Sequence, residues 1–191
     1  DIDKVYAERH KLIQHRDMIF NNIIKSNPPL DTSDGIIPKN IHMVWYDKHN
    51  TACNSIPDKN KSIVQNWKIY NPEFHIKKWH NKDLEELVSS YGPEVKNFFD
   101  SIKTVISKCD FSRFLIIYKY GGIYTDVDFY CLKPIDYLIN NKETVFFEEL
   151  PEHMTEYKQL FNGIFAAKKQ HPFVGGWIQY MMTNFYEPKN A

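Results

Sequence analysis

The stretch that decides the fold of this chain is residues 107–128, SKCDFSRFLIIYKYGGIYTDVD. Before the double glycine at 121–122, apolar residues recur at helical spacing, and a glycine can supply the left-handed position that ends a helix. After it, the pattern changes to the alternation of a strand. We therefore predict a helix, a tight turn and a strand over 123–128, with Asp126 and Asp128 on one face of that strand.

Two carboxylates one pleat apart repel each other, and a divalent cation relieves that repulsion. Mg²⁺ or Mn²⁺ is usually held by one or two carboxylates together with substrate phosphates, so Asp126 and Asp128 favour a nucleotide diphosphate ligand. The alternative is that both are solvated residues at the end of an edge strand. That reading suits an isolated Asp-x-Asp, whereas the helix and double glycine in fixed order before this one favour the metal.

These residues carry a family resemblance. The segment 108–113, KCDFSR, followed by Leu115 and by 121–128, GGIYTDVD, resembles the sugar-binding region of DXD-type glycosyltransferases. The nearest groups are the family 32 transferases, which include yeast-type initiating α-1,6-mannosyltransferases, and the glucosylating domains of large clostridial toxins. The resemblance runs over roughly residues 36 to 175. It implies a GT-A fold, a nucleotide-sugar donor, a divalent cation and retention of anomeric configuration.

Composition indicates one globular domain. The chain has 191 residues, 42% of them hydrophobic and 15% aromatic, which is enough to form a sizeable core. Lys plus Arg and Asp plus Glu both number 24, so no basic field indicates nucleic acid. No run approaches the roughly 20 apolar residues that a membrane span needs.

Strand and helix patterns alternate along the chain. This order predicts a doubly wound α/β fold with a mostly parallel sheet covered by helices on both faces, and the resemblance implies that the fold is of the GT-A, Rossmann-like type. The predicted strands are 37–46, 74–79, 123–128, 145–149 and 161–167, and the predicted helices are 57–71, 81–92, 102–120 and a stretch after 171.

The chain divides into two predicted parts. Residues 1–35 read as an amphipathic helix and a polar linker, and residues 36–191 as the GT-A catalytic domain. We take the helix as a packing arm, with a dimerisation helix that makes a homo-oligomer, or a stalk, as alternatives. The resemblance implies a further C-terminal segment, which we expect 36–191 to lack. Because the chain starts at Asp1, localisation stays open between the cytoplasm and a Golgi-type lumen behind a removed anchor.

The first predicted strand ends in Val44 and Trp45, and ligands of open α/β sheets sit beyond the carboxyl ends of strands. Segment 37–45, IPKNIHMVW, matches the family pattern Ile-Pro-Lys-x-Ile-His-x-x-Trp. It resembles the toxin segment whose tryptophan stacks on uracil. We therefore expect Val44 and Trp45 to contact the donor, with Trp45 stacking on its base; the alternative is a core tryptophan. His42 is expected to be a structural residue of the strand.

Asp110 and Arg113 share one face of the central helix, where such a pair is usually a surface ion pair. The resemblance implies instead that Asp110 accepts hydrogen bonds from sugar hydroxyls and that Arg113 lies near the sugar and phosphates. It also implies that Asn162 faces the donor sugar or the acceptor. Cys109, where the family has a small residue, is expected to pack and not to act as a nucleophile.

Together these features predict a metal-dependent retaining glycosyltransferase that moves a hexose from UDP-hexose or GDP-mannose to a sugar or protein hydroxyl. The alternatives are a non-catalytic nucleotide-sugar binding module and a metal phosphohydrolase, which would need further ligands. The predicted catalytic residues are Asp110, Arg113 and Asp128, the donor-binding residues are Val44, Trp45, Asp110, Arg113, Tyr124, Asp126 and Asn162, and the Mn²⁺ or Mg²⁺ ligands are Asp126 and Asp128.

Overall fold

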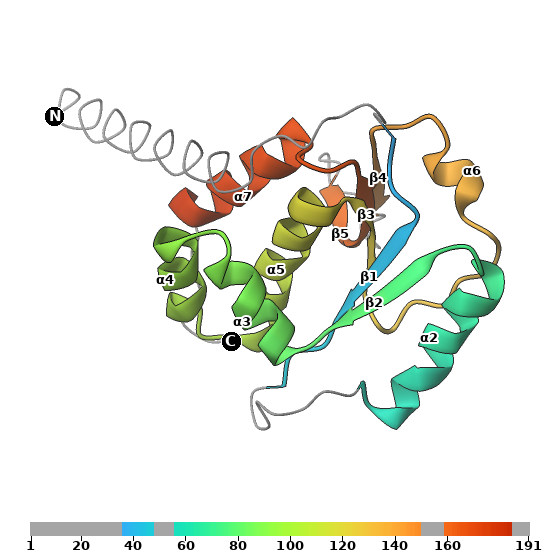
Figure 1. Cartoon of the computed structure of the whole chain (residues 1–191), viewed down its shortest axis with the longest axis horizontal. Helices are drawn as coiled ribbons and strands as arrows, with labels where there is room; N and C mark the ends of the chain where they lie inside the picture. Colours follow the sequence, from blue (N-terminus) through green and yellow to red (C-terminus); the bar gives the residue numbers. More distant parts are fainter. Residues whose placement is uncertain (1–35, 48–55, 150–158, 185–191) are drawn as a thin grey trace, which may run out of the picture.

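A computed structural model describes residues 36–47, 56–149 and 159–184, and in them the chain forms one five-stranded sheet in the order β2-β1-β3-β5-β4 (Figure 1). Strand β1 pairs in parallel with β2 and β3, while β5 runs antiparallel to both β3 and β4. Four of these five strands therefore point the same way, which confirms the predicted mostly parallel sheet. The strands are β1 (Asn40–Val44), β2 (His75–Trp79), β3 (Gly122–Thr125), β4 (Thr144–Glu149) and β5 (Gln159–Ala167).

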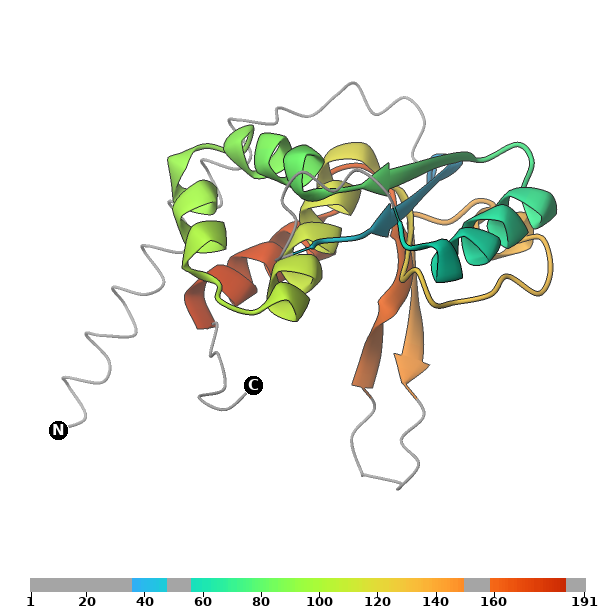
Figure 2. The ribbon, with the colours of Figure 1, turned by 90° about the horizontal axis from the view of Figure 1, so that it is seen from below.

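Helices cover both faces of the sheet, as predicted. Helices α3, α4, α5 and α7 lie on one side and α2 and α6 on the other (Figures 1 and 2). Each side has its own apolar core, one between α5 and the sheet and one beneath α2 and α6. The helices are α2 (Asp58–Tyr70), α3 (Asn81–Ser89), α4 (Pro93–Ser101), α5 (Val105–Tyr120), α6 (Asp136–Ile139) and α7 (Pro172–Asn184).

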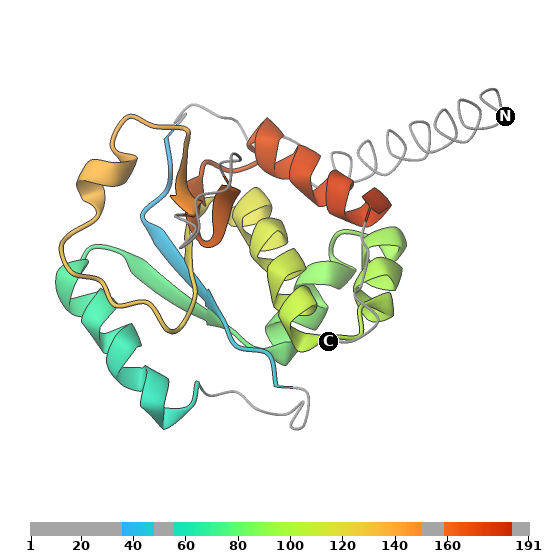
Figure 3. The ribbon, with the colours of Figure 1, turned by 180° about the vertical axis from the view of Figure 1, so that it is seen from behind.

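Helix α5 is the centre of the larger core, between α7 and the sheet (Figure 3). Residues 111–118 are all buried, so its middle turns have no solvent face. Glycine is needed where the helix meets β3, because Gly122 has a φ of +107° and a Cβ there would lie 2.6 Å from the carbonyl oxygen of Asn40. The double glycine therefore ends the helix, as predicted, and lets β3 lie close to β1.

A buried histidine supports this turn. His42 is buried, accepts a hydrogen bond at Nδ1 from Trp79 Nε1 (3.1 Å) and contacts the carbonyl oxygen of Gly121 through Nε2 (3.0 Å). Since Nδ1 accepts, Nε2 carries the proton and donates. Burial lowers the pKa of His42 to about 4, so the ring is neutral. His42 is thus the structural strand residue that was expected.

Two helices were missed and one strand was predicted too long. Neither α4 nor α6 was predicted, and α4 begins at Pro93, where proline is well tolerated because the first N–H of a helix has no helical partner. The strand predicted over 123–128 ends at Thr125. The N–H of Asp126 still bonds to the Gly163 oxygen (2.8 Å), after which a turn begins.

The predicted N-terminal helix and linker, 1–35, lie outside the described residues, and so does the question of a dimer made through them. Within the described ranges, no helix combines the length and the apolar character needed to cross a bilayer.

Candidate active site

A cleft of about 320 Å³ opens where β1 and β3 end, against the first turns of α5. Both strands point their carboxyl ends at it because they are parallel neighbours. The predicted residues that line this cleft are Val44, Trp45, Arg113, Tyr124, Asp126 and Asp128, and the others are Tyr46, Val105, Ile106, Cys109 and Val127. Six of the eight predicted site residues therefore share one cleft wall.

Arg113 joins the remaining two residues to this cleft. Its side chain is only 6% exposed, and its guanidinium contacts Asp110 Oδ1 at 2.7 Å and Asp126 Oδ1 at 3.3 Å. It also donates to the backbone oxygen of Asn162 (2.8 Å). The Asn162 amide in turn donates to Asp110 Oδ1 at 3.4 Å. Asp110 and Asn162 thus border the cleft through Arg113. The Asp110–Arg113 pair is not the exposed surface ion pair of the alternative reading, because Arg113 is buried.

Tyr124 adds a second support to Asp126. Its hydroxyl donates to Asp126 Oδ1 (2.6 Å), and the Arg113 guanidinium lies 4.7 Å from the centre of its ring. Burial raises the pKa of Tyr124 well above its ordinary value, so the hydroxyl stays protonated and remains a donor. Oδ1 of Asp126 is therefore committed to protein partners.

The charges in the cleft do not balance. Burial raises the pKa values of Asp110 and Asp126 above the ordinary 3.8, and the positive charge of Arg113 opposes that shift. One guanidinium faces these two carboxylates, and Asp128 adds a third acidic group nearby that further raises the pKa of Asp126. An additional cation would stabilise the ionised forms of all three.

The donor set suits a hard divalent cation completed by a ligand. Carboxylate oxygens from Asp126 and Asp128 are the groups that Mg²⁺ and Mn²⁺ prefer. In the part of the chain that the structure describes, no group of three or more His, Cys, Asp or Glu side chains is placed to hold a metal by itself. Substrate oxygens and water would complete the shell of a cation held by Asp126 and Asp128.

The two aspartates reach the cleft differently from the prediction. Because β3 ends at Thr125, Asp126 and Asp128 lie on either side of Val127 in a turn and not on one face of a strand. Asp126 is half-buried, whereas Asp128 is exposed. The inner carboxylate is therefore held by Arg113 and Tyr124, and the outer one is open to solvent.

Helix α2 holds this turn from the other side, which the sequence analysis missed. A row of side chains from α2, and from Asn71 directly after it, bonds to the backbone of residues 127–135. Asn60 Nδ2 donates to the Val127 oxygen (3.0 Å) and Trp67 Nε1 donates to the Phe129 oxygen (2.7 Å). Asn66 Oδ1 accepts from the Cys131 N–H (2.7 Å), and Asn71 Oδ1 accepts from the Ile135 N–H (3.0 Å). The signal in the sequence that could have indicated these bonds is the row of asparagines beside the apolar stripe of α2. Trp67 is 2% exposed, so it both fills the core and belongs to this row.

The predicted base-stacking residue lies at the cleft wall. Trp45 follows β1, its N–H donates to the Trp79 oxygen (2.9 Å), and its side chain is half-buried. Ile106 of the first turn of α5 lines the same cleft and is 73% exposed. Trp45 is therefore not a fully buried core residue, and its stacking on a base stays a prediction.

Cys109 also lines the cleft but is unsuited to nucleophilic chemistry. Burial raises the pKa of its thiol to about 11, with Arg113 opposing the shift, so the thiolate is scarce at neutral pH. This agrees with the expectation that Cys109 is a packing residue.

Residues 57–145 match the model of a protein family described as "Glycosyltransferase sugar-binding region containing DXD motif". The chain is similar to the DXD-type glycosyltransferases. It is 28% identical over 158 residues to inositol phosphoceramide mannosyltransferase 3 of Schizosaccharomyces pombe, covering 83% of this chain and 39% of that protein. It is 33% identical over 111 residues to the initiation-specific α-1,6-mannosyltransferase of Candida albicans, covering 56% of this chain and 28% of that protein. The predicted resemblance is confirmed.

Solved structures show the same fold. The PaToxG glycosyltransferase superposes with a TM-score of 0.58 over 97% of this chain and 72% of that one, at 20% sequence identity. Similarity at this level concerns the fold alone, and it confirms the predicted GT-A architecture. The chain spans less than half the length of the two yeast relatives, so their activities are not transferred with the similarity.

Proposed function

We propose that this chain is a metal-dependent glycosyltransferase that moves a hexose from a nucleotide-diphosphate sugar to a hydroxyl group. The observation that carries the proposal is the buried Arg113, which joins Asp110, Asp126 and Asn162 beside Trp45 and Asp128. These side chains come from separate segments, and the buried guanidinium, together with a divalent cation on Asp126 and Asp128, would supply the positive charge that a nucleotide diphosphate needs.

The donor would lie along the cleft from Trp45 to Arg113. Trp45 would stack on the base, Val44 and Tyr124 would contact the nucleoside, and Asp110 with Asn162 would receive the sugar hydroxyls. The half-buried carboxylate of Asp110 is fixed by Arg113, so it is a rigid acceptor. The names of the two yeast relatives favour mannose, with GDP-mannose as the donor and UDP-hexose as the alternative.

In the reaction, the bond between the sugar C1 and the diphosphate oxygen breaks and a bond from C1 to the acceptor oxygen forms. A divalent cation held by Asp126 and Asp128 would neutralise the departing diphosphate. Arg113 stabilises the charge that develops on the same group, because contacts with Asp110, Asp126 and Asn162 already hold its guanidinium in place. With retention, the acceptor attacks on the face that the diphosphate leaves, and its proton passes to a phosphate oxygen.

The first test is titration calorimetry of the chain with GDP and with UDP, each with Mn²⁺ and with a chelator. We expect one nucleotide to bind, and only with metal. Asp126→Asn with Asp128→Asn should abolish that binding, while Asp100→Asn, a surface carboxylate on α4, should leave it unchanged. Undiminished binding by a folded double variant would refute the assigned site.

A second measurement separates an enzyme from a binding module. Release of GDP or UDP from the matching sugar nucleotide is followed with and without mannose and mannosides as acceptors. Turnover is the expected result. Metal-dependent nucleotide binding with no release under either condition would support the non-catalytic module instead.

A further inference from the structure

A second, smaller hollow lies beside the candidate active site, between α7 and the β4–β5 pair. Its lining is almost entirely aromatic and apolar, and it has one polar residue. The lining residues are Phe114, Phe146, Leu160, Phe161, Asn162, Phe173 and Trp177. We call this surface, together with Tyr180, the aromatic groove. The cleft residues described above do not account for it.

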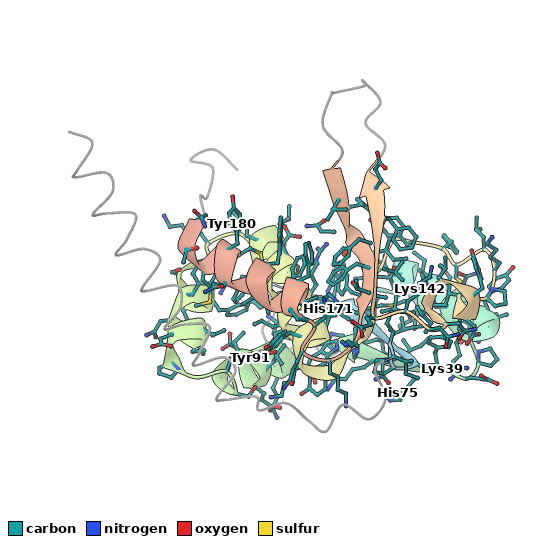
Figure 4. The ribbon with its side chains drawn as sticks, turned by 90° about the horizontal axis from the view of Figure 1, so that it is seen from above. Lys39, His75, Tyr91, Lys142, His171 and Tyr180 are labelled. Carbon is teal, nitrogen blue, oxygen red and sulfur yellow. The ribbon has the colours of Figure 1, made fainter. Side chains whose placement is uncertain are left out.

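Helix α7 presents an exposed aromatic stripe to this groove. Phe173, Trp177 and Tyr180 recur at spacings of four and three, and they are 42%, 40% and 57% exposed. Neighbouring rings are stacked, with centres 6.2 Å apart at 17° for the first pair and 5.6 Å apart at 30° for the second. The three rings therefore form one continuous aromatic stripe, and part of each ring is exposed to solvent. Tyr180 is at the far end of α7 from His171 (Figure 4).

The groove is continuous with the candidate active site. Asn162 lines the groove, while its backbone oxygen accepts from Arg113 and its amide donates to Asp110. Phe114 of the groove is the next residue after Arg113 on α5. A ligand lying on the aromatic rings would thus reach the sugar end of the proposed donor site, which is where an acceptor hydroxyl must arrive.

We propose that the aromatic groove is the acceptor subsite and that it binds a neutral saccharide, an inference that rests on the proposed function. Helix α7 contains no Asp, Glu, Lys or Arg, so the ligand that it favours is uncharged. A pyranose ring has a flat face of C–H groups that packs on an aromatic ring and a rim of hydroxyls. Asn162, which lines the hollow, and the hydroxyl of the exposed Tyr180 can bond to that rim.

The shape and charge of the groove disfavour lipid. The hollow holds only about 30 Å³, roughly the space of one water molecule, so it cannot enclose an acyl chain. Helices that lie on membranes usually carry Lys and Arg on their polar face, and α7 carries neither. A ligand that lies flat on the rings fits this surface better than one that inserts into it.

The test is a titration of the full chain with α-1,6-mannobiose and with cellobiose, in the presence of Mn²⁺ and the nucleotide that binds, followed by ligand-observed NMR. We expect Trp177→Ala to weaken saccharide binding about tenfold and Trp177→Tyr, which keeps an aromatic ring, to weaken it much less. The matched control is Tyr137→Ala, which removes another exposed aromatic ring, on α6 and outside the groove, and it should have no effect.

Each outcome decides one claim. Equal saccharide binding by wild type and a folded Trp177→Ala variant, or no saccharide binding by wild type, overturns the acceptor subsite. So does Trp177-dependent binding to phosphatidylcholine vesicles without saccharide binding, or a dimer in ultracentrifugation that Trp177→Ala dissociates. Failure of wild type to bind either nucleotide with Mn²⁺ contradicts the proposed function instead, and it is measured separately by calorimetry.

Discussion

Replacement of Arg113 by methionine should destabilise the fold and disorder the candidate site together. The guanidinium is 6% exposed and contacts Asp110, Asp126 and the backbone oxygen of Asn162. Removing one partner of a fully buried ion pair costs roughly 3–5 kcal/mol, but here the carboxylates are 35% and 32% exposed and regain some hydration. We therefore expect Arg113→Met to lower the free energy of unfolding by about 3 kcal/mol at pH 7.

The loss should depend on pH with a definite sign. In the folded chain the pKa values of Asp110 and Asp126 are raised by burial, so folding favours their protonated forms. Without Arg113 these pKa values should rise further, because the opposing positive charge is gone. The destabilisation should therefore be largest above the folded pKa values and shrink as the pH falls toward the ordinary value of 3.8.

Urea denaturation of wild type and variant, followed by circular dichroism from pH 7 to pH 4, measures both effects. Lys96→Met is the matched control, since Lys96 pairs with Asp100 on the surface and should be worth no more than about 1 kcal/mol. If Arg113→Met costs no more than Lys96→Met, or if its cost grows as the pH falls, the assigned role of the guanidinium is wrong.

Three further variants probe the scaffold of the site. Gly122→Ala should lower the free energy of unfolding in urea by about 3 kcal/mol or more, because its Cβ would meet a backbone oxygen at 2.6 Å. Gly92→Ala is the control: its φ is similar but the space around it is open, so it should cost about 1 kcal/mol. Equal losses of unfolding free energy would contradict this reasoning. Trp67→Phe removes the bond to the Phe129 oxygen, so it should lower unfolding free energy by about 2 kcal/mol and weaken Mn²⁺-dependent nucleotide binding in calorimetry; unchanged affinity would show that α2 does not position the turn. His42 should titrate by NMR with a pKa of about 4. Its contribution to the free energy of unfolding should be complete above pH 6.5 and lost as the pH falls to about 4. A measured pKa near 6.5 would refute its buried neutral state.

Local sequence was sufficient for the central unit. The periodicity before Gly121, the two glycines and the apolar residues after them identified α5, the turn and β3, because each depends on neighbours within a few positions. The position of Trp45 at the cleft also followed, since parallel strands bring their carboxyl ends to the same edge.

The sequence by itself therefore determined the five strands, the GT-A resemblance and six of the residues that line the cleft. Only the tertiary structure decided that β3 stops before Asp126, that Arg113 bonds to Asn162, 49 residues away, and that Asn60 of α2 holds Val127, 67 residues away. Contacts at such separations depend on how layers pack, which no local periodicity encodes. The same packing placed the aromatic stripe of α7 beside the candidate site, where it becomes a surface for a second substrate.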